Sequence, residues 1–201
     1  MKNNSIYKLM KLLRAVTEEV ATICGFTDAQ LLTATLCAES KGEPLQGQQG
    51  VLNVILNRAE TYHGVSNPGT PNPIYQGSSR VSIAILRKWQ FSCWNGTNTC
   101  ESFKTEYAKA IADCTINLTT ADYSVFEGAT LEEAKKIFHY INPKTSTSKE
   151  WWVRQVKTQS NAHPTDTSWT AQLPTKMGVS TLVTWRFWRI GAHVFVSGPA
   201  L

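Results

Sequence analysis

Hydrophobic positions recur along this chain with helical and strand periods, and the clearest helical pattern begins just after residue 26. Thr27 and Gln30 have the spacing of a capping box and precede a long apolar run. The run stops at Gly42, a residue typical of helix C-termini, and Pro44 suits the first position of a following helix. The pattern predicts two helices that meet at a corner. The first is too apolar for a surface helix.

The remaining patterns are shorter. Residues 5–24 predict an amphipathic basic helix, which either contacts a membrane surface or docks on the rest of the protein. Helices are also predicted near residues 81–88, 101–114 and 130–138, loops or irregular chain at 61–80 and 144–175, and a β-hairpin at 185–197.

The length of 201 residues suits a single domain with a sizeable core. We therefore expect an α+β fold that is mostly α, with a small C-terminal β-hairpin. Residues 1–26 form an N-terminal helix in this interpretation, and residues 27–201 form one domain.

Glu39 is the most interesting ionisable residue of the predicted corner, because it falls in the last turn of the apolar helix. A helix C-terminus and apolar neighbours both disfavour the charged carboxylate, so we expect a raised pKa, which suits a general acid. The alternative is that Glu39 is exposed and only hydrogen-bonds the corner. Glu43 lies in the turn itself, where we expect it to be solvated.

The charge and the cysteine content limit the partners and cofactors that we expect for this protein. The net charge of +5 favours anionic surroundings. Lys and Arg are dispersed and no groove-reading motif appears, so nucleic acid is not the expected partner. The five Cys have no metal-binding spacing, and no metal or organic cofactor is expected. Cys24 and Cys37 are predicted to be buried thiols, whereas Cys93 and Cys100 could close a small loop in an oxidising compartment.

Four sequence blocks, in order, resemble the spore-cortex-lytic cell-wall hydrolase family (SleB type). The first contains Ala-Glu-Ser-Lys-Gly-Glu-Pro, then Gly-Gln, then Val-Ile-Leu-Asn-Arg, and spans residues 38–58. The others are Gln-Phe-Ser-Cys-Trp-Asn (90–95), Tyr-Ile-Asn-Pro (140–143) and Ile-Gly-Ala-His-Val-Phe (190–195). The chain departs from the family pattern at an insertion over residues 77–89 and at Ala192, where the family has Asn.

The resemblance implies a lysozyme-like, α-rich domain that cleaves the glycan strands of peptidoglycan, with Glu39 as the catalytic acid. It also implies substrate contacts in the later blocks, with Phe91 and Trp94 as stacking walls; without the resemblance these two rings would be assigned to the core. The predicted substrate-binding set is Gln48, Gln90, Phe91, Ser92, Trp94, Tyr140 and His193. Asn57 and Arg58 are expected to brace the corner.

The expected chemistry follows from the carboxylates. Glycoside hydrolysis usually needs two of them, and the sequence has no Asp or Glu between Glu60 and Glu101. Asp122, Glu127 and Asp166 remain candidates for a second one. A lytic transglycosylase needs only one acid, because the 6-hydroxyl of the muramyl sugar replaces water as the nucleophile, so we favour this reaction over hydrolysis.

Two other functions stay open: a non-catalytic peptidoglycan-binding module, and a basic protein that binds membranes or nucleic acid. No signal-peptide pattern or membrane-spanning run is visible. We therefore expect a monomer made in the cytoplasm that acts on the wall after release, as a phage endolysin or a virion-borne enzyme does, with transient contact to anionic membranes.

Overall fold

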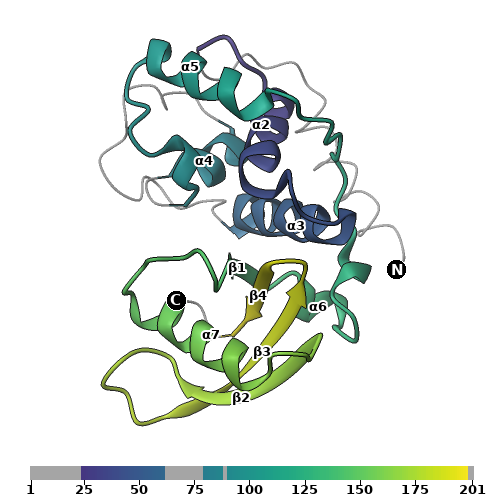
Figure 1. Cartoon of the computed structure of the whole chain (residues 1–201), viewed down its shortest axis with the longest axis vertical. Coiled ribbons are helices and arrows are strands. Elements are labelled where there is room, and N and C mark those ends of the chain that lie inside the picture. Colours follow the sequence, from purple (N-terminus) through teal and green to yellow (C-terminus); the bar gives the residue numbers. More distant parts are fainter. Residues whose placement is uncertain (1–23, 62–78, 88–89, 199–201) are drawn as a thin grey trace, which may run out of the picture. The chain divides into compact units, whose positions relative to one another are not determined.

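The computed structural model describes residues 24–61, 79–87 and 90–198 (Figure 1). The fold is mixed α and β and mostly helical, as predicted. Its helices are α2 (Asp28–Ser40), α3 (Leu45–Thr61), α4 (Arg80–Leu86), α5 (Cys100–Ile111), α6 (Leu131–Ala134) and α7 (Trp151–Ala162). Short 3-10 helices lie at η2 (Ser92–Trp94) and η3 (Tyr123–Val125). The strands are β1 (Ile137–Ile141), β2 (Ser168–Pro174), β3 (Leu182–Ile190) and β4 (His193–Ser197).

The chain divides into two compact units. The first comprises residues 1–41 and 58–121, and the second residues 42–57 and 122–201, so that the division falls within α3. Nearly all of the predicted N-terminal segment (1–26) and most of the predicted loop at 61–80 lie outside the described residues. The prediction of a single domain over residues 27–201 stays a prediction.

The first unit is built around α2, and its start matches the sequence pattern. Gln30 N donates to Thr27 Oγ1, and Thr27 N donates to Gln30 Oε1, which completes the capping box. Apolar side chains on several sides of α2 are buried, and the helix packs against α4 and α5. A second capping box, between Thr99 and Ser102, starts α5. The helix α2 lacks a polar face because it packs against two other helices.

The cysteine predictions were wrong. Cys24 is bonded to Cys100, and Cys37 is bonded to Cys114, whereas Cys93 is the free thiol. The two disulfides link α2 and α5 near both of their ends. The pairing of the cysteines follows from the packing of α2 against α5. The spacing of cysteines along the sequence does not reveal that packing.

The second unit contains a four-stranded antiparallel sheet in the order β1-β4-β3-β2. The predicted hairpin is confirmed as β3 and β4, which pair from Ile190 opposite His193 and turn through Gly191, whose φ is +61°. The sheet is larger than the predicted hairpin, since β1 and β2 extend it on both sides (Figure 1).

Two predictions in this unit were wrong. Residues 144–175, predicted to be irregular, contain α7 and β2. The helix predicted at 130–138 is correctly capped by Thr130, which accepts from Glu133 N, but α6 ends after one turn. Ile137 is instead the first residue of β1, where it is fully buried. The sheet core therefore overrides the local helical preference.

The two faces of the sheet are buried by different elements. One face packs against α7 in a cluster formed by Ile141, Val153, Val156, Trp169, Trp185, Phe187, Val194 and Val196. On the other face Phe126 contacts both Trp188 and Phe195, with ring centroids 5.6 and 5.5 Å away. Gly50 of α3 lies so close to Phe195 that an added Cβ would stand 2.5 Å from the ring. No helix in the described part of the chain is long and apolar enough to cross a membrane.

Candidate active site

Glu39 lies in the last turn of α2, as predicted, and its side chain is half-buried. Three contacts hold this end of α2 in place. Cys37 is disulfide-bonded to Cys114, Ser40 Oγ donates to Leu36 O at 2.7 Å, and Lys41 Nζ donates to Ala112 O at 2.7 Å. These contacts fix the backbone that carries the carboxylate. The raised pKa expected for Glu39 stays a prediction.

Cys93 is hydrogen-bonded to the Glu39 side chain. Burial raises the pKa of the Cys93 thiol, and the negative charge and hydrogen bond of Glu39 raise it further. The thiol therefore stays protonated near neutral pH and donates to the carboxylate. Cys93 was not predicted to belong to the site, although its position in the Gln-Phe-Ser-Cys-Trp block was an available signal.

The short helix η2 carries Cys93, and the next residue, Trp94, anchors this helix to α2. Trp94 Nε1 donates to Thr35 Oγ1 at 3.0 Å, and the indole stacks on Phe103 with centroids 4.8 Å apart. Thr35 precedes Glu39 by about one helical turn. Packing in the core of the first unit thus sets the distance between thiol and carboxylate.

Phe91 and Trp94 do not form the predicted stacking walls. They are 2% and 4% exposed and belong to the core. The Arg58 guanidinium lies 5.1 Å from the centre of the Phe91 ring, so Arg58 braces this block, whereas it was predicted to brace the corner. Ser92 is exposed and Gln90 half-buried, and their predicted contacts with substrate stay predictions.

The other predicted binding residues belong to the second unit. Gln48 Nε2 donates to Glu43 O at 2.9 Å, which closes the turn before α3. Tyr140 and His193 lie on neighbouring strands with ring centroids 4.8 Å apart. His193 is 6% exposed, and burial lowers its pKa while the nearby Glu43 carboxylate opposes that shift. The roles of Gln48, Tyr140 and His193 in substrate binding stay predictions.

Glu43 was expected to be a solvated turn residue, and this prediction was wrong. Its Oε2 accepts from Ala192 N at 2.8 Å and thereby holds the turn between β3 and β4. A Cβ at Gly191 would come within 2.7 Å of Pro44 Cδ, so the close approach needs glycine. The first and last sequence blocks therefore meet here through a structural contact.

Two of the three candidates for a second carboxylate bind residues close to them in the sequence, and the third is exposed. Asp122 caps η3 by accepting from Ser124 N and Oγ, and these bonds lower the pKa of Asp122. Asp166 pairs with His163 at 3.0 Å. Glu127 is exposed. Asn57, expected at the corner, instead donates to Ala134 O and Ile137 O and fastens the start of β1.

Comparison with known proteins decides the family. A family model described as Cell Wall Hydrolase matches residues 42–164, more than half of the chain. The chain belongs to the cell wall hydrolase family. No curated protein and no solved structure matches it. Membership suggests a peptidoglycan-cleaving activity and implies a peptidoglycan substrate. The matched region of this cell wall hydrolase includes Cys93 and Tyr140, begins three residues after Glu39 and ends before His193.

Proposed function

We propose that this cell wall hydrolase cleaves the bond between N-acetylmuramic acid and N-acetylglucosamine in peptidoglycan, as a lytic transglycosylase with Glu39 as its acid and base. The observation that carries the proposal is the half-buried carboxylate of Glu39, fixed at a cross-linked helix end and hydrogen-bonded by Cys93. Family membership supplies the substrate class.

In the proposed reaction, protonated Glu39 donates its proton to the glycosidic oxygen as the bond to the muramyl anomeric carbon breaks. The resulting carboxylate then removes the proton of the muramyl 6-hydroxyl, whose oxygen attacks the same anomeric carbon. A 1,6-anhydromuramyl end forms, and Glu39 recovers its proton. Cys93 keeps the carboxylate in one orientation during both transfers.

A muramidase is the alternative within this proposal, with Asp122, Glu127 or Asp166 as the second carboxylate. The local contacts of Asp122 and Asp166 favour structural roles for these two residues. The transglycosylase needs no second carboxylate, which agrees with the sequence between Glu60 and Glu101. For this reason we favour the single-acid reaction.

We also propose that the enzyme acts outside the cytoplasm after release, as an endolysin does. The two disulfides support this location, because disulfides persist in oxidising compartments.

Mass spectrometry of digested peptidoglycan, combined with a Glu39→Gln variant, tests the function. We expect anhydromuramyl ends from the native enzyme and a loss of activity of at least about a hundredfold in the variant. Glu101→Gln, which removes an exposed carboxylate at the start of α5, is the matched control and should retain activity. Reducing ends would replace the transglycosylase by a muramidase, and equal clearing by Glu39→Gln would remove Glu39 from the mechanism.

A further inference from the structure

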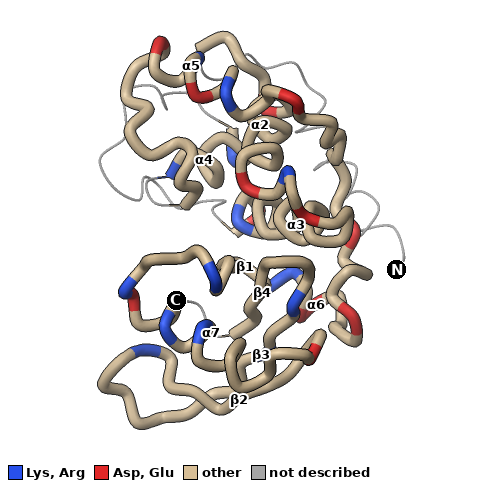
Figure 2. The backbone as a smooth tube through the Cα atoms, viewed as in Figure 1, with Lys and Arg blue, Asp and Glu red and all other residues tan. Residues whose placement is uncertain are grey.

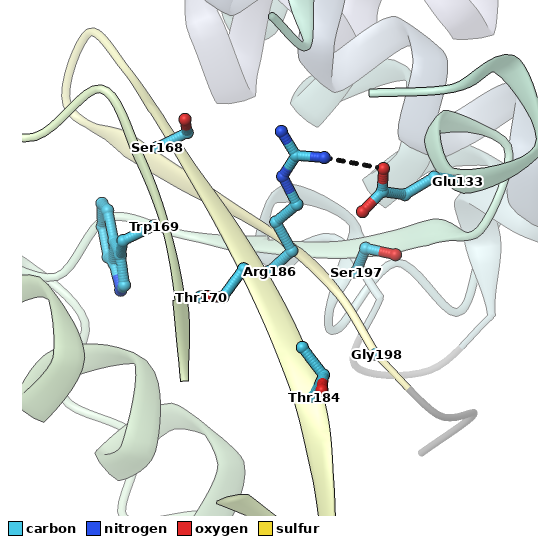
Figure 3. Close-up of a pocket in the computed structure, with 8 residues that line it drawn as sticks. All are labelled: Glu133, Ser168, Trp169, Thr170, Thr184, Arg186, Ser197 and Gly198. Atoms are coloured by element: carbon cyan, nitrogen blue, oxygen red, sulfur yellow. Dashed lines mark hydrogen bonds and ion pairs between the residues drawn. The ribbon is translucent and has the colours of Figure 1, made fainter. Parts of the chain in front are cut away.

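The second unit contains an open pocket of about 580 Å³ that the reaction proposed above does not use (Figure 3). It lies over β2, β3 and β4, where Thr170, Arg186 and Ser197 stand directly opposite one another on adjacent strands. Ser168, Thr184 and Glu133 complete its polar lining. We call this pocket the polar tray.

Arg186 is held rigidly in the polar tray. Its Nη1 donates to Glu133 Oε2 at 2.9 Å and to Gly128 O at 3.0 Å, and its guanidinium lies 5.0 Å from the Trp188 ring centre. Nη2 lies 3.5 Å from Glu127 O, at the long limit of a hydrogen bond. A guanidinium fixed in this way loses little conformational entropy when it donates to a ligand oxygen.

The hydroxyl groups define what kind of ligand would fit. Ser and Thr both donate and accept, so the lining matches alternating N–H and C=O groups, as in a peptide. Trp169 borders the polar tray, but this residue is only 7% exposed, and its ring stacks on Phe187 in the core with centroids 5.3 Å apart. No other aromatic residue lines the pocket among those that the structure describes. A flat face for stacking a sugar ring is therefore lacking there.

The charges of the polar tray further restrict the ligand. Glu133 offsets Arg186, so the lining does not favour a polyanion. Acidic residues of α6 and basic residues of β3 both occur in this unit (Figure 2). A paired cation and anion instead complement a short ligand with one carboxylate next to amide or ammonium groups.

We propose that the polar tray binds the peptide stem of peptidoglycan, with Arg186 donating to a stem carboxylate and the strand hydroxyls pairing with its amides. This inference rests on the proposed function for its substrate class. The site adds affinity for cross-bridged wall and takes no part in the cleavage step.

Sedimentation with purified cell walls tests the proposal in the Glu39→Gln background, where cleavage does not remove the binding sites. We expect walls stripped of their stems by an amidase to bind at least about tenfold more weakly than intact walls. Arg186→Gln should weaken binding to intact walls by about tenfold, because one charge-assisted hydrogen bond is lost. A synthetic stem peptide with a free carboxylate should compete better than its amide.

Two further variants keep the test decisive. Thr170→Val combined with Ser197→Ala leaves the pair between Arg186 and Glu133 intact and should weaken binding roughly threefold. Lys176→Gln removes one positive charge at an exposed position outside the polar tray and should bind like the parent. Equal binding to intact and stripped walls, or parental binding by both tray variants, would overturn the proposal. Failure of the catalytic proposal would appear separately, as unaltered clearing by Glu39→Gln.

Discussion

The two units of this enzyme are stabilised in different ways. The first contains all five cysteines, and two disulfides connect its helices α2 and α5. The second contains no cysteine and is held by a sheet with aromatic clusters on both faces. The candidate acid lies in the cross-linked unit, and the polar tray lies in the sheet. The proposed catalytic site and the proposed binding site therefore lie in units that are stabilised by different physical interactions.

The difference has a thermodynamic meaning. A disulfide stabilises chiefly by restricting the unfolded chain, and its contribution disappears on reduction. Packed aromatic side chains stabilise through burial, which redox conditions do not change. Four experiments test whether the two units are stabilised in these different ways.

Loss of a disulfide should have the largest effect. In a Cys37→Ser, Cys114→Ser double variant, we expect the free energy of unfolding of the first unit to fall by about 2–5 kcal/mol. Hydrogen exchange followed by mass spectrometry would measure this, with faster exchange in α2 and α5 and little change in β3 and β4. Equal destabilisation of both units would show that they unfold together and would contradict their separate stabilisation.

The second unit should respond most to crowding in its aromatic core. Gly50→Ala places a methyl group against the Phe195 ring and should destabilise this unit by about 1–3 kcal/mol, measured by chemical denaturation. Gly42→Ala adds the same group where nothing lies within 4 Å and serves as the control. Partial rescue of Gly50→Ala by Phe195→Leu would show that the ring contact is responsible.

The thiol of Cys93 reports on the environment of Glu39. Since burial and the Glu39 charge raise its pKa, we expect slow alkylation by iodoacetamide at pH 8. Glu39→Gln should accelerate the reaction, about tenfold for each unit by which the pKa falls. Glu106→Gln, which removes the weakest of the effects that raise this pKa, should change the rate less. The opposite order would contradict the contact between Glu39 and Cys93.

His193 should make the second unit sensitive to acid. Because burial lowers its pKa in the folded protein, the unfolded chain binds more protons once the pH falls below about 6.5. Stability is then lost as the pH falls towards the folded pKa, with a slope of at most about 1.4 kcal/mol per pH unit. Thermal unfolding between pH 7.5 and 5 should show a smaller loss in His193→Gln, whereas an equal loss would assign the effect to other groups.

Several features could be predicted because their signals are local. The capping box at Thr27, the break at Gly42 and the hairpin turn at Gly191 are each encoded within a few residues. Glu39 was found in the same way, from its place at the end of an apolar helix. The family blocks then implied a catalytic role for Glu39, which stays a prediction.

The failed predictions concern contacts between distant segments. Strands β1 and β2 have weak patterns of their own and form because they exchange backbone hydrogen bonds with β4 and β3. The family resemblance implied that Phe91 and Trp94 form a binding wall, but the packing of Trp94 on Phe103 and the position of Arg58 over Phe91 place them in the core. Glu43, likewise, finds its partner 149 positions later in the chain.

Short-range periodicity and ordered motifs encode the helix that carries Glu39, the C-terminal hairpin and the likeness to the enzyme family, so these could be predicted before folding was considered. The folded protein alone reveals which cysteines are bonded, that Cys93 contacts Glu39, and that Arg186 is held by Glu133 and Gly128 at a polar surface of the sheet. These arrangements depend on which segments become neighbours after folding. The spacing of residues along the chain does not directly show which segments become neighbours.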